Sequence, residues 1–325
     1  MLEPADLERH QIGFFAVAVV LGAAAGLGVP RTAVRFDPFI APALIVLLYS
    51  TFLQVPLVRL RAALGAKRFL RALLAVNFLA VPVLVWGLLA LVPAAPAVRL
   101  GVLLVLLTPC IDYVVVFTRM GGGDAARLLA ATPILLLMQL GLLPAYLALL
   151  LGVDFAAAID PAPFLEALFI YILLPLAGAA LTERQATRRP AAARWARAMA
   201  WVPVPALAVT LFLVAASQVP RVAGNFDLIA GLVPVYAGYL LTAALLGTAA
   251  ARAFRLDAPS GRALVFSAGT RNSLVILPLA LAAPRHGALV AAVVVTQTLV
   301  ELVGELVYIR VVPGWLVPSE RKQPN

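Results

Sequence analysis

Two short stretches place polar and ionisable residues inside otherwise apolar surroundings. The first, TPCIDYVVVFTRMGGGD, holds a proline, the only cysteine of the chain and an aspartate within a few positions. The second, SAGTRNSLVILPLA, holds Arg271. Proline removes a helix hydrogen bond, and an ionisable side chain is costly to bury in lipid, so both persist in membranes mostly where they line a cavity or a path. We therefore expect a solute or ion site at these two stretches.

Asp112 and Arg271 carry opposite charges near the middle of two apolar runs. Burying either charge alone costs at least about 3 kcal/mol, so we expect them to pair with each other or to contact a substrate. Two interpretations remain open. The two side chains form a permanent salt bridge that locks two helices, or they form a substrate or proton site.

Cys110 lies between Pro109 and Asp112. Its thiol is either a small buried apolar group or a soft ligand that faces a cavity. One thiol is too few for a structural metal site, which needs about four ligands. We expect no resident metal and no cofactor.

Gln297, Glu301 and Glu305 are spaced four residues apart and form one stripe on a helix. The stripe could relay protons or coordinate a cation. It could also simply bond to polar side chains on other helices, such as those of Asn77, Thr132 and Gln139. Asp112 and Glu301 against Arg271 leave one buried carboxylate unpaired, and that carboxylate is a plausible proton carrier.

The composition indicates a polytopic membrane protein. Hydrophobic residues make up 63% of the 325 residues, charged residues 12%, and the mean hydropathy is +1.02. The net charge of +10 is spread between apolar runs, which argues against nucleic acid as a partner. The sequence has no H-E-x-x-H or G-x-S-x-G motif, so an enzyme is not expected. The first residues, MLEPADLERH, are net acidic, which favours a spanning helix over a cleaved signal peptide.

Apolar runs of about 20 residues predict ten spanning helices in an all-α protein. The predicted spans are 12–30, 38–58, 69–92, 98–119, 127–151, 162–181, 199–220, 227–251, 262–283 and 287–312. Alternate connections differ sharply in positive charge, with 19 Arg and Lys residues in one set and 5 in the other. The richer set is Arg9, Arg59, Arg61, Lys67, Arg68, Arg71, Arg119, Arg127, Arg184, Arg188, Arg189, Arg194, Arg197, Arg252, Arg255, Arg262, Arg310, Arg321 and Lys322. The poorer set is Arg31, Arg35, Arg99, Arg221 and Arg285, with the acidic residues Asp154 and Asp160. Because positive charge marks the cytoplasmic side, both termini are predicted to be cytoplasmic, in the plasma (inner) membrane.

Ten spans divide into two halves of five, residues 1–155 and 156–325, which would insert with opposite topology. Inverted repeats are a transporter architecture with the site near the midplane, at interrupted helices. At an offset of 160 residues the two special stretches align, with these pairs: Gly101 and Gly261, Pro109 and Gly269, Cys110 and Thr270, Asp112 and Asn272. Gly22 and Gly26 predict close helix packing. The run 121–123 of three glycines predicts a hinge or a tight connection, and the prolines at 42, 56, 82, 144, 175 and 234 predict helix kinks or ends.

The motifs TPCIDYVVVFTRMGGGD and FSAGTRNSLVILPLALA resemble the bile acid/arsenite/riboflavin transporter superfamily, which includes bile acid:sodium symporters and arsenical-resistance permeases. The resemblance implies that spans four and nine are unwound and cross in a core domain that moves against a panel domain. Arsenite permeases have an essential Cys after a Pro in span four, which matches Pro109–Cys110, and the resemblance is closest to that branch. They also have a Glu in span nine, where this chain has Ser273 and its neighbours.

The sodium symporters have a Glu four residues before a Gln-Asn pair in span nine, and the Glu and Gln serve sodium sites. Aligning that pair with Arg271–Asn272 places Ser267 at the Glu and Arg271 at the Gln. A fixed guanidinium would repel sodium and supply positive charge permanently. We therefore expect that sodium coupling at this position is lost, and that Arg271 suits an anion.

These residues predict a proton-linked, sodium-independent secondary transporter in the lipid bilayer that exports arsenite or a related small oxyanion. The expected substrate-binding residues are Cys110, Asp112, Thr270, Arg271, Asn272 and Ser273, and the expected ion- or proton-coupling residues are Asp112, Gln297 and Glu301. One alternative is a sodium-coupled symporter of an organic anion, with sodium held by the same three coupling residues. Another is a non-transporting membrane sensor or scaffold.

Overall fold

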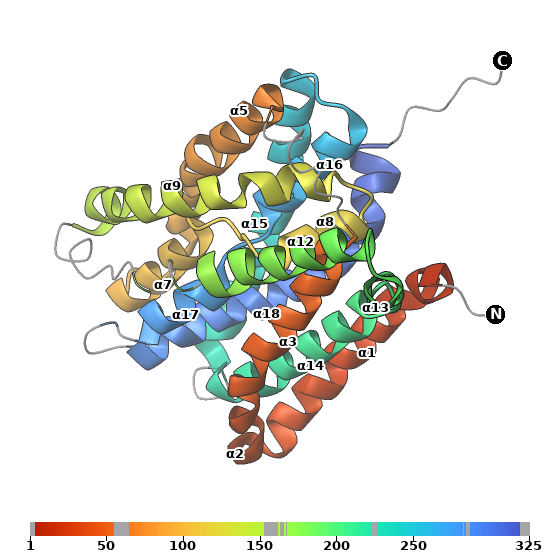
Figure 1. Cartoon of the computed structure of the whole chain (residues 1–325). Coiled ribbons are helices and arrows are strands. Elements are labelled where there is room, and N and C mark those ends of the chain that lie inside the picture. Colours follow the sequence, from red (N-terminus) through yellow and green to blue (C-terminus); the bar gives the residue numbers. More distant parts are fainter. Residues whose placement is uncertain are drawn as a thin grey trace. The chain divides into compact units, whose positions relative to one another are not determined.

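A computed structural model describes residues 4–54, 65–152, 162, 166, 168–222, 226–281, 283 and 287–318. This part of the chain is helical and contains no strand (Figure 1). Several residues used to predict topology lie outside the described residues, namely Pro56, Arg59, Arg61, Asp154, Asp160, Arg285, Arg321 and Lys322.

Six helical stretches among the described residues are long and apolar enough to cross a membrane. They are Pro30–Phe52, Lys67–Leu91, Ala125–Leu151, Pro203–Pro220, Ala230–Ala253 and Gly287–Leu316. These stretches confirm six of the predicted spans by length and composition. Two shorter apolar helices, Gly13–Gly28 and Pro96–Leu106, overlap the predicted spans one and four. The total of ten spans stays a prediction.

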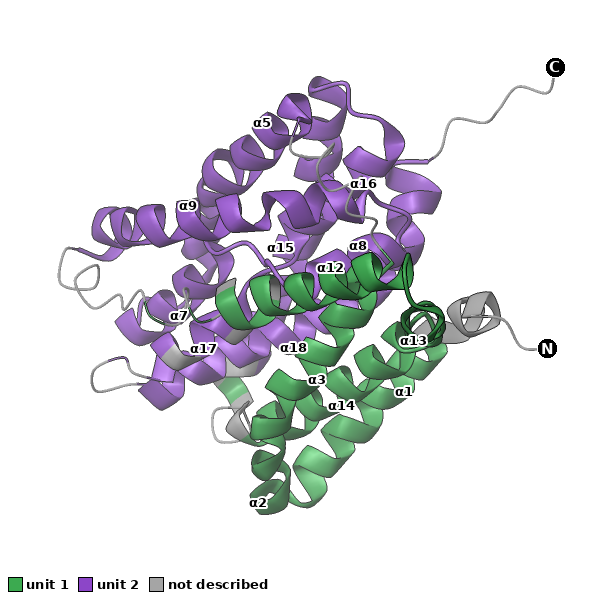
Figure 2. Ribbon diagram, in the orientation of Figure 1, with its two compact units in different colours: residues 1–59, 161–229 green, residues 60–160, 230–325 purple. Residues whose placement is uncertain are grey.

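The chain divides into two compact units, residues 1–59 with 161–229 and residues 60–160 with 230–325 (Figure 2). Each unit therefore takes helices from both predicted halves of the sequence. The predicted halves are repeats along the chain rather than compact bodies, so this division does not decide whether they are inverted copies.

Unit 1 is built on the pairing of α1 with α14. Its elements are α1 (Pro4–Gly28), α2 (Pro30–Ala33), η1 (Val34–Phe36), α3 (Asp37–Phe52), η4 (Leu168–Leu173), α12 (Leu174–Ala186), α13 (Pro190–Met199) and α14 (Pro203–Val222). The helices α1 and α14 lie side by side (Figure 1). A Cβ atom at Gly22 would lie 2.5 Å from the Phe212 carbonyl oxygen, and one at Gly26 would lie 2.7 Å from the Ala216 carbonyl oxygen. The predicted role of Gly22 and Gly26 in close packing is confirmed.

Unit 2 contains both special stretches. Its elements are α5 (Lys67–Ala75), η2 (Val76–Ala80), α6 (Val81–Leu88), η3 (Leu89–Leu91), α7 (Pro96–Leu106), α8 (Val114–Met120), α9 (Ala125–Leu151), most of α15 (Phe226–Ala253), α16 (Ala258–Gly269), α17 (Ser273–Leu281), α18 (Gly287–Val311) and η6 (Val312–Leu316). The helix α18 packs against α7 and α17, and α16 packs against α8. Within this unit, two predicted spans are therefore divided into separate helices, α7 with α8 and α16 with α17.

Proline positions explain several helix boundaries. Pro96 and Pro203 begin α7 and α14, because a first-turn residue needs no N–H donor. Pro42, Pro144 and Pro234 lie inside α3, α9 and α15, which continue through them. In membrane proteins, neighbouring helices can supply partners for the backbone groups that such prolines leave without a hydrogen bond. The remaining two, Pro82 and Pro175, lie in the first turns of α6 and α12, directly after the π-helical turns η2 and η4.

The three glycines after α8 form a tight connection rather than an open hinge. Gly122 has φ +66°, a conformation that glycine adopts without strain. A Cβ atom at Gly121 would collide with the Phe266 ring, and one at Gly123 would lie 2.7 Å from Thr118 Cγ2. The connection therefore lets α8 and α16 approach closely.

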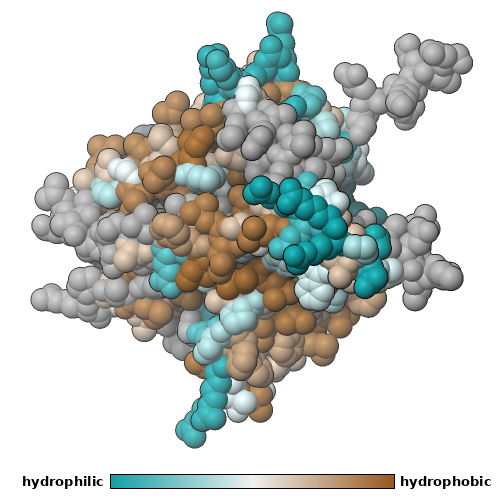
Figure 3. All heavy atoms as spheres, viewed as in Figure 1, coloured by the Kyte–Doolittle hydropathy of each residue, from teal (hydrophilic) through white to brown (hydrophobic). Residues whose placement is uncertain are grey.

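Large apolar side chains cover much of the described surface. Trp315 is 86% exposed and Leu149 is 81% exposed, and hydrophobic residues dominate the face shown in Figure 3. Water does not tolerate apolar patches of this extent on a soluble monomer. The chain is an integral membrane protein.

Candidate functional site

The first break in unit 2 begins where α7 ends at Leu106. Pro109 has no N–H and cannot continue the helix ladder. The Thr108 hydroxyl is 2.8 Å from the Leu104 carbonyl oxygen and 3.2 Å from that of Val105, so it serves the end of α7 in place of the missing donors. The backbone then runs non-helically until α8 begins at Val114.

The second break separates α16 from α17 at Thr270, Arg271 and Asn272. The two breaks pair with each other through their main chains. Cys110 N donates to Thr270 O at 3.1 Å, and Asn272 N donates to Thr108 O at 2.9 Å, around an antiparallel bridge between Pro109 and Arg271. We call these paired segments, residues 107–113 and 270–272, the crossing. Main-chain groups freed by one break are thus satisfied by the other.

Arg271 is fully buried, and among the described residues its guanidinium bonds to oxygen atoms only. Nη2 donates to the side-chain oxygen of Asn77 at 2.9 Å and to the carbonyl oxygen of Ala268 at 2.7 Å, and it also bonds to the carbonyl oxygen of Ser267. Nη1 donates to Leu106 O at 3.4 Å. Three of these acceptors are carbonyls in the last turns of α7 and α16, where the helix dipole favours positive charge.

Two tyrosines contact Arg271, one at its guanidinium and one at its main chain. Arg271 Cζ lies 5.7 Å from the centre of the Tyr239 ring, within the range of a cation–π interaction. The Tyr239 hydroxyl donates to Ala268 O at 2.8 Å, so it also serves the end of α16. The Tyr113 hydroxyl lies 3.3 Å from Arg271 O.

Asp112 does not pair with Arg271. Among the described residues no ion pair joins these two side chains. The structure therefore does not contain the predicted alternative of a permanent salt bridge between them. Instead, Asp112 Oδ1 accepts from Cys110 Sγ at 2.9 Å and from Tyr113 N at 2.7 Å, just before α8 begins. Both Cys110 and Asp112 are buried, at 0% and 1% exposure. The sulfur and the carboxylate therefore form a contiguous pair beside the break.

Glu301 joins α18 to both breaks. It accepts from the Tyr113 hydroxyl at 2.7 Å, from Arg271 N at 2.7 Å and from Gln297 Nε2 at 2.5 Å. One helical turn further, Glu305 Oε1 lies 2.7 Å from the Thr270 hydroxyl oxygen. The stripe predicted on this helix thus faces the crossing.

The remaining predicted residues lie at the same place. Asn272 and Ser273 are buried, and the Ser273 hydroxyl is 3.5 Å from that of Tyr113. Six of the ten buried side-chain polar atoms without a hydrogen-bond partner among the described residues lie here. They are Asp112 Oδ2, Arg271 Nε, Asn272 Nδ2, Asn272 Oδ1, Gln297 Oε1 and Glu305 Oε2. Buried polar atoms are rarely left without a partner, so this concentration suits a site that binds a solute or an ion.

The polar side chains predicted as possible partners of the stripe form no hydrogen bond with it among the described residues. Asn77, in the π-helical turn η2, donates to Ser267 Oγ at 3.1 Å and accepts from Arg271. Thr132 donates to Leu129 O at 2.8 Å, and the Gln139 amide has no hydrogen-bond partner among the described residues. A π-helical turn often marks a functional position. The residues of η2 do not indicate from the sequence that a π-helical turn forms there.

Sequence reasoning missed two residues of the site, Tyr113 and Tyr239. Tyr113 stands directly after Asp112, so its polar hydroxyl beside an interrupted helix was a usable signal. Tyr239 lies in the middle of an apolar helix, and the sequence does not indicate which helix face meets the crossing.

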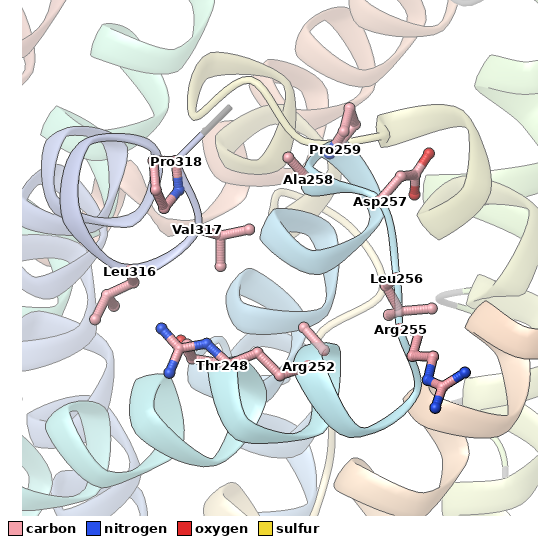
Figure 4. Close-up of a pocket in the computed structure, with 11 residues that line it drawn as sticks. Thr248, Arg252, Arg255, Leu256, Asp257, Ala258, Pro259, Leu316, Val317 and Pro318 are labelled. Carbon is pink, nitrogen blue, oxygen red and sulfur yellow. The ribbon is translucent and has the colours of Figure 1, made fainter. Parts of the chain in front are cut away.

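A surface pocket of about 590 Å³ lies elsewhere in unit 2 (Figure 4). It is lined by Thr248, Ala251, Arg252, Arg255, Leu256, Asp257, Ala258, Pro259, Leu316, Val317 and Pro318. None of these residues belongs to the crossing. The pocket is therefore separate from the candidate site.

Comparisons with known proteins bear on the family. A search of curated proteins gives no match. The sequence profile of the sodium bile acid symporter family matches residues 41–225, which is more than half of the chain. The matched region contains the first break and stops before the second. On this match, the chain belongs to the sodium bile acid symporter family.

Proposed function

We propose that the protein is a secondary transporter that moves arsenite or a related small oxyanion out of the cytoplasm, linked to protons and independent of sodium. Members of its family are transporters and not enzymes, and they carry small organic anions, usually with sodium. The observation that carries the proposal is the charge arrangement at the crossing. One guanidinium, bonded only to neutral oxygen atoms, lies among three buried carboxyl groups.

The acceptors around Arg271 support independence from sodium. Carbonyl and amide oxygens are the ligands that hard cations prefer, and here a guanidinium fixed to the chain uses four of them. A side chain that is always charged supplies positive charge in every state of the transporter and repels a free cation.

The three carboxyl groups support the proton link. Asp112, Glu301 and Glu305 are each at most 1% exposed, and Arg271 is the only basic side chain that bonds at the crossing in the described part of the chain. If all three were ionised, two negative charges would remain uncompensated in a medium of low dielectric. Protons can supply that compensation, and Asp112 or Glu301 would carry the transported one.

The substrate residues are proposed from chemistry and position. Cys110 provides a soft sulfur ligand of the kind that binds thiophilic solutes. Asn272 offers an amide whose donor and acceptor atoms bond to no described residue. Thr270 and Ser273 offer hydroxyl groups in the same segment, and Arg271 attracts negative charge.

We also propose the topology predicted from charge, with both termini in the cytoplasm and ten spans in two inverted halves in the plasma (inner) membrane. Three connections predicted to be cytoplasmic meet in unit 2, which supports their placement on one side of the membrane. Arg127 Nη1 lies 3.0 Å from Asp257 Oδ1, while Arg262 donates to Gly122 O at 3.1 Å and to Val317 O at 2.9 Å. We assign unit 2 as the core domain and unit 1 as the panel domain.

Transport into everted membrane vesicles tests the proposal. We expect arsenite to accumulate when the vesicle interior is acidified, with choline in place of sodium, and we expect Cys110→Ser to abolish accumulation. Cys110→Ala distinguishes loss of the thiol from loss of any polar atom. Accumulation that ignores the proton gradient would exclude the coupling, and unchanged accumulation in Cys110→Ser would exclude the thiol as a ligand.

The family favours one alternative, a sodium-coupled symporter of a small organic anion. Sodium would then bind at Asp112, Gln297 and Glu301, where Asp112 Oδ2 and Gln297 Oε1 have no partner among the described residues. Sodium, but not choline, would raise the melting temperature of the purified wild-type protein in this case.

A further inference from the structure

We infer that Glu305 is a second proton-binding residue, held as a neutral carboxylic acid against Thr270 while Glu301 beside it is held as a carboxylate. A role of Glu305 in coupling rests on the proton-linked transport proposed above. Its protonation state can be tested without any transported solute.

The two carboxyl groups have different surroundings, although they share one face of α18. Glu301 accepts three hydrogen bonds, from Tyr113, from Gln297 and from the main chain of Arg271. Since an ionised carboxylate only accepts hydrogen bonds, this set of donors suits the charged form. The Arg271 N–H, which precedes α17, also places Glu301 near the positive end of that helix.

Glu305 contacts a hydroxyl group that has a single hydrogen for two neighbouring oxygen atoms. Its only hydrogen-bond contact among the described residues is Thr270 Oγ1, at 2.7 Å. The same oxygen lies 2.7 Å from the carbonyl oxygen of Phe266. A hydroxyl carries one hydrogen and can donate to one of these two acceptors. When Thr270 donates to Phe266, the contact with Glu305 is a hydrogen bond only if Glu305 is the donor, and therefore protonated.

The second oxygen of Glu305 supports the same state. Oε2 is buried and has no hydrogen-bond partner among the described residues. In a carboxylate this oxygen would carry part of a negative charge with no compensation, deep within a membrane protein. In a carboxylic acid it carries no formal charge.

Few charged or titratable groups face Glu305 from the elements around it. On α18 these are Glu301 and Tyr308, and across the break it is Arg271. Tyr239 on α15 directs its hydroxyl to the Ala268 carbonyl oxygen. The helix α17 contains no ionisable residue, and the only ones in α7 and α16 are Arg99 and Arg262, each near the start of its helix. The guanidinium of Arg271 is already bonded to carbonyl and amide oxygens, so it does not form an ion pair with Glu305.

Release of the proton has a local consequence at the crossing. When the O–H bond of Glu305 breaks, its proton leaves to water and the carboxylate becomes an acceptor. The Thr270 hydroxyl then turns from the Phe266 carbonyl oxygen to Glu305. Thr270 belongs to the segment whose main chain pairs with Cys110. A change in the protonation state of Glu305 therefore changes a hydrogen bond at the crossing.

Infrared spectroscopy of the purified protein in lipid tests this assignment. We expect wild type at neutral pH to show a carbonyl stretch of a protonated carboxyl group that shifts in heavy water. Glu305→Gln is expected to remove the amplitude of one such group, and it should fold because the glutamine amide also donates to Thr270. The matched control is Glu301→Gln, which we expect to retain the full band.

Thr270→Val supplies a measurement that does not depend on the Glu305 variants. We expect the band to remain but to move in frequency, because the acid loses its acceptor. An unchanged band in Glu305→Gln would overturn the assignment, as would loss of the band in Glu301→Gln instead. Absence of any transported solute would leave these spectra as they are, so failure of the proposed function is distinguishable from failure of this inference.

Discussion

Arg271 bonds to carbonyl oxygens at which two helices stop, so its charge is set against main-chain dipoles and not against a carboxylate. Removing the side chain would take a donor from the Leu106 carbonyl and from the Asn77 amide oxygen, and it would leave the Ala268 carbonyl with the Tyr239 hydroxyl alone. Without the Arg271 side chain, these carbonyl and amide oxygen atoms would surround an unfilled space. Such a set of oxygen atoms resembles the ligand sets that bind monovalent and divalent metal ions.

We therefore predict that Arg271→Ala becomes sensitive to sodium. Its melting temperature should fall well below that of wild type in choline chloride and recover in part in sodium chloride, because sodium replaces the lost positive charge. Arg271→Lys keeps a charge and serves as the control, with no response to sodium. Equal melting temperatures of Arg271→Ala in both salts would contradict the prediction.

The hydrogen bond between Tyr113 and Glu301 gives a second prediction about single residues. Tyr113→Phe removes the hydroxyl that donates to Glu301 at 2.7 Å and should cost about 1–3 kcal/mol of stability, as expected for a lost hydrogen bond to a charged group. A double-mutant cycle with Glu301→Gln measures the coupling. Strictly additive effects on thermal stability would show that the two side chains do not interact.

Individual site residues could be predicted from the sequence where they are chemically out of place. Cys110, Asp112 and Arg271 stand out in apolar runs, and the crossing contains all three. Their partners could not be predicted, because the bonds depend on how separate helices meet. Asn77 is one of the side chains predicted as possible partners of the stripe on α18, and it bonds to Arg271 and Ser267 instead.

The two helix breaks have different causes. Pro109 ends the first helix by removing a donor, which the sequence predicts directly. The second break contains no proline. It is held by donors from outside its own helix, since the guanidinium of Arg271 and the hydroxyl of Tyr239 both serve carbonyls at the end of α16. The position of that break was expected from the family resemblance and from Gly269, the helix-weakening residue that aligns with Pro109.

The contact between α1 and α14 provides a test within one helix. Gly26→Ala places a methyl group against the Ala216 carbonyl oxygen and should cost about 1–3 kcal/mol through overpacking. Gly13→Ala, in the same helix, has no described atom within 4 Å of the new methyl group apart from its chain neighbours and the backbone of its own helix. It should be neutral or stabilising by up to about 1 kcal/mol. Thermal unfolding of both variants decides the point, and equal destabilisation by the two would refute close packing at Gly26.

For the whole molecule, composition and span length were sufficient to predict a helical membrane protein, and six long apolar helices agree. The division into two units could not be predicted. Each unit combines two segments that are separated in the sequence by a long part of the other unit. An apolar span has no polar face to indicate its neighbours, so hydropathy gives the number of crossings but not their grouping.

The orientation in the membrane can be measured because the chain has a single, buried cysteine. In a Cys110→Ala background, Arg194→Cys should react with a membrane-impermeant maleimide only in everted vesicles, and Arg31→Cys only in intact cells. This follows from the asymmetry of positive charge. Labelling of both positions from the same side would contradict the predicted topology.

The pairing of the two breaks through main-chain atoms has a consequence for how such a protein diversifies. The bonds from Cys110 N to Thr270 O and from Asn272 N to Thr108 O use groups that almost every amino acid possesses. Exchange of the side chains at these positions therefore leaves the junction of the two segments intact. Changes of cargo or driving ion can accumulate there by ordinary point substitution, without an intermediate that has lost its architecture.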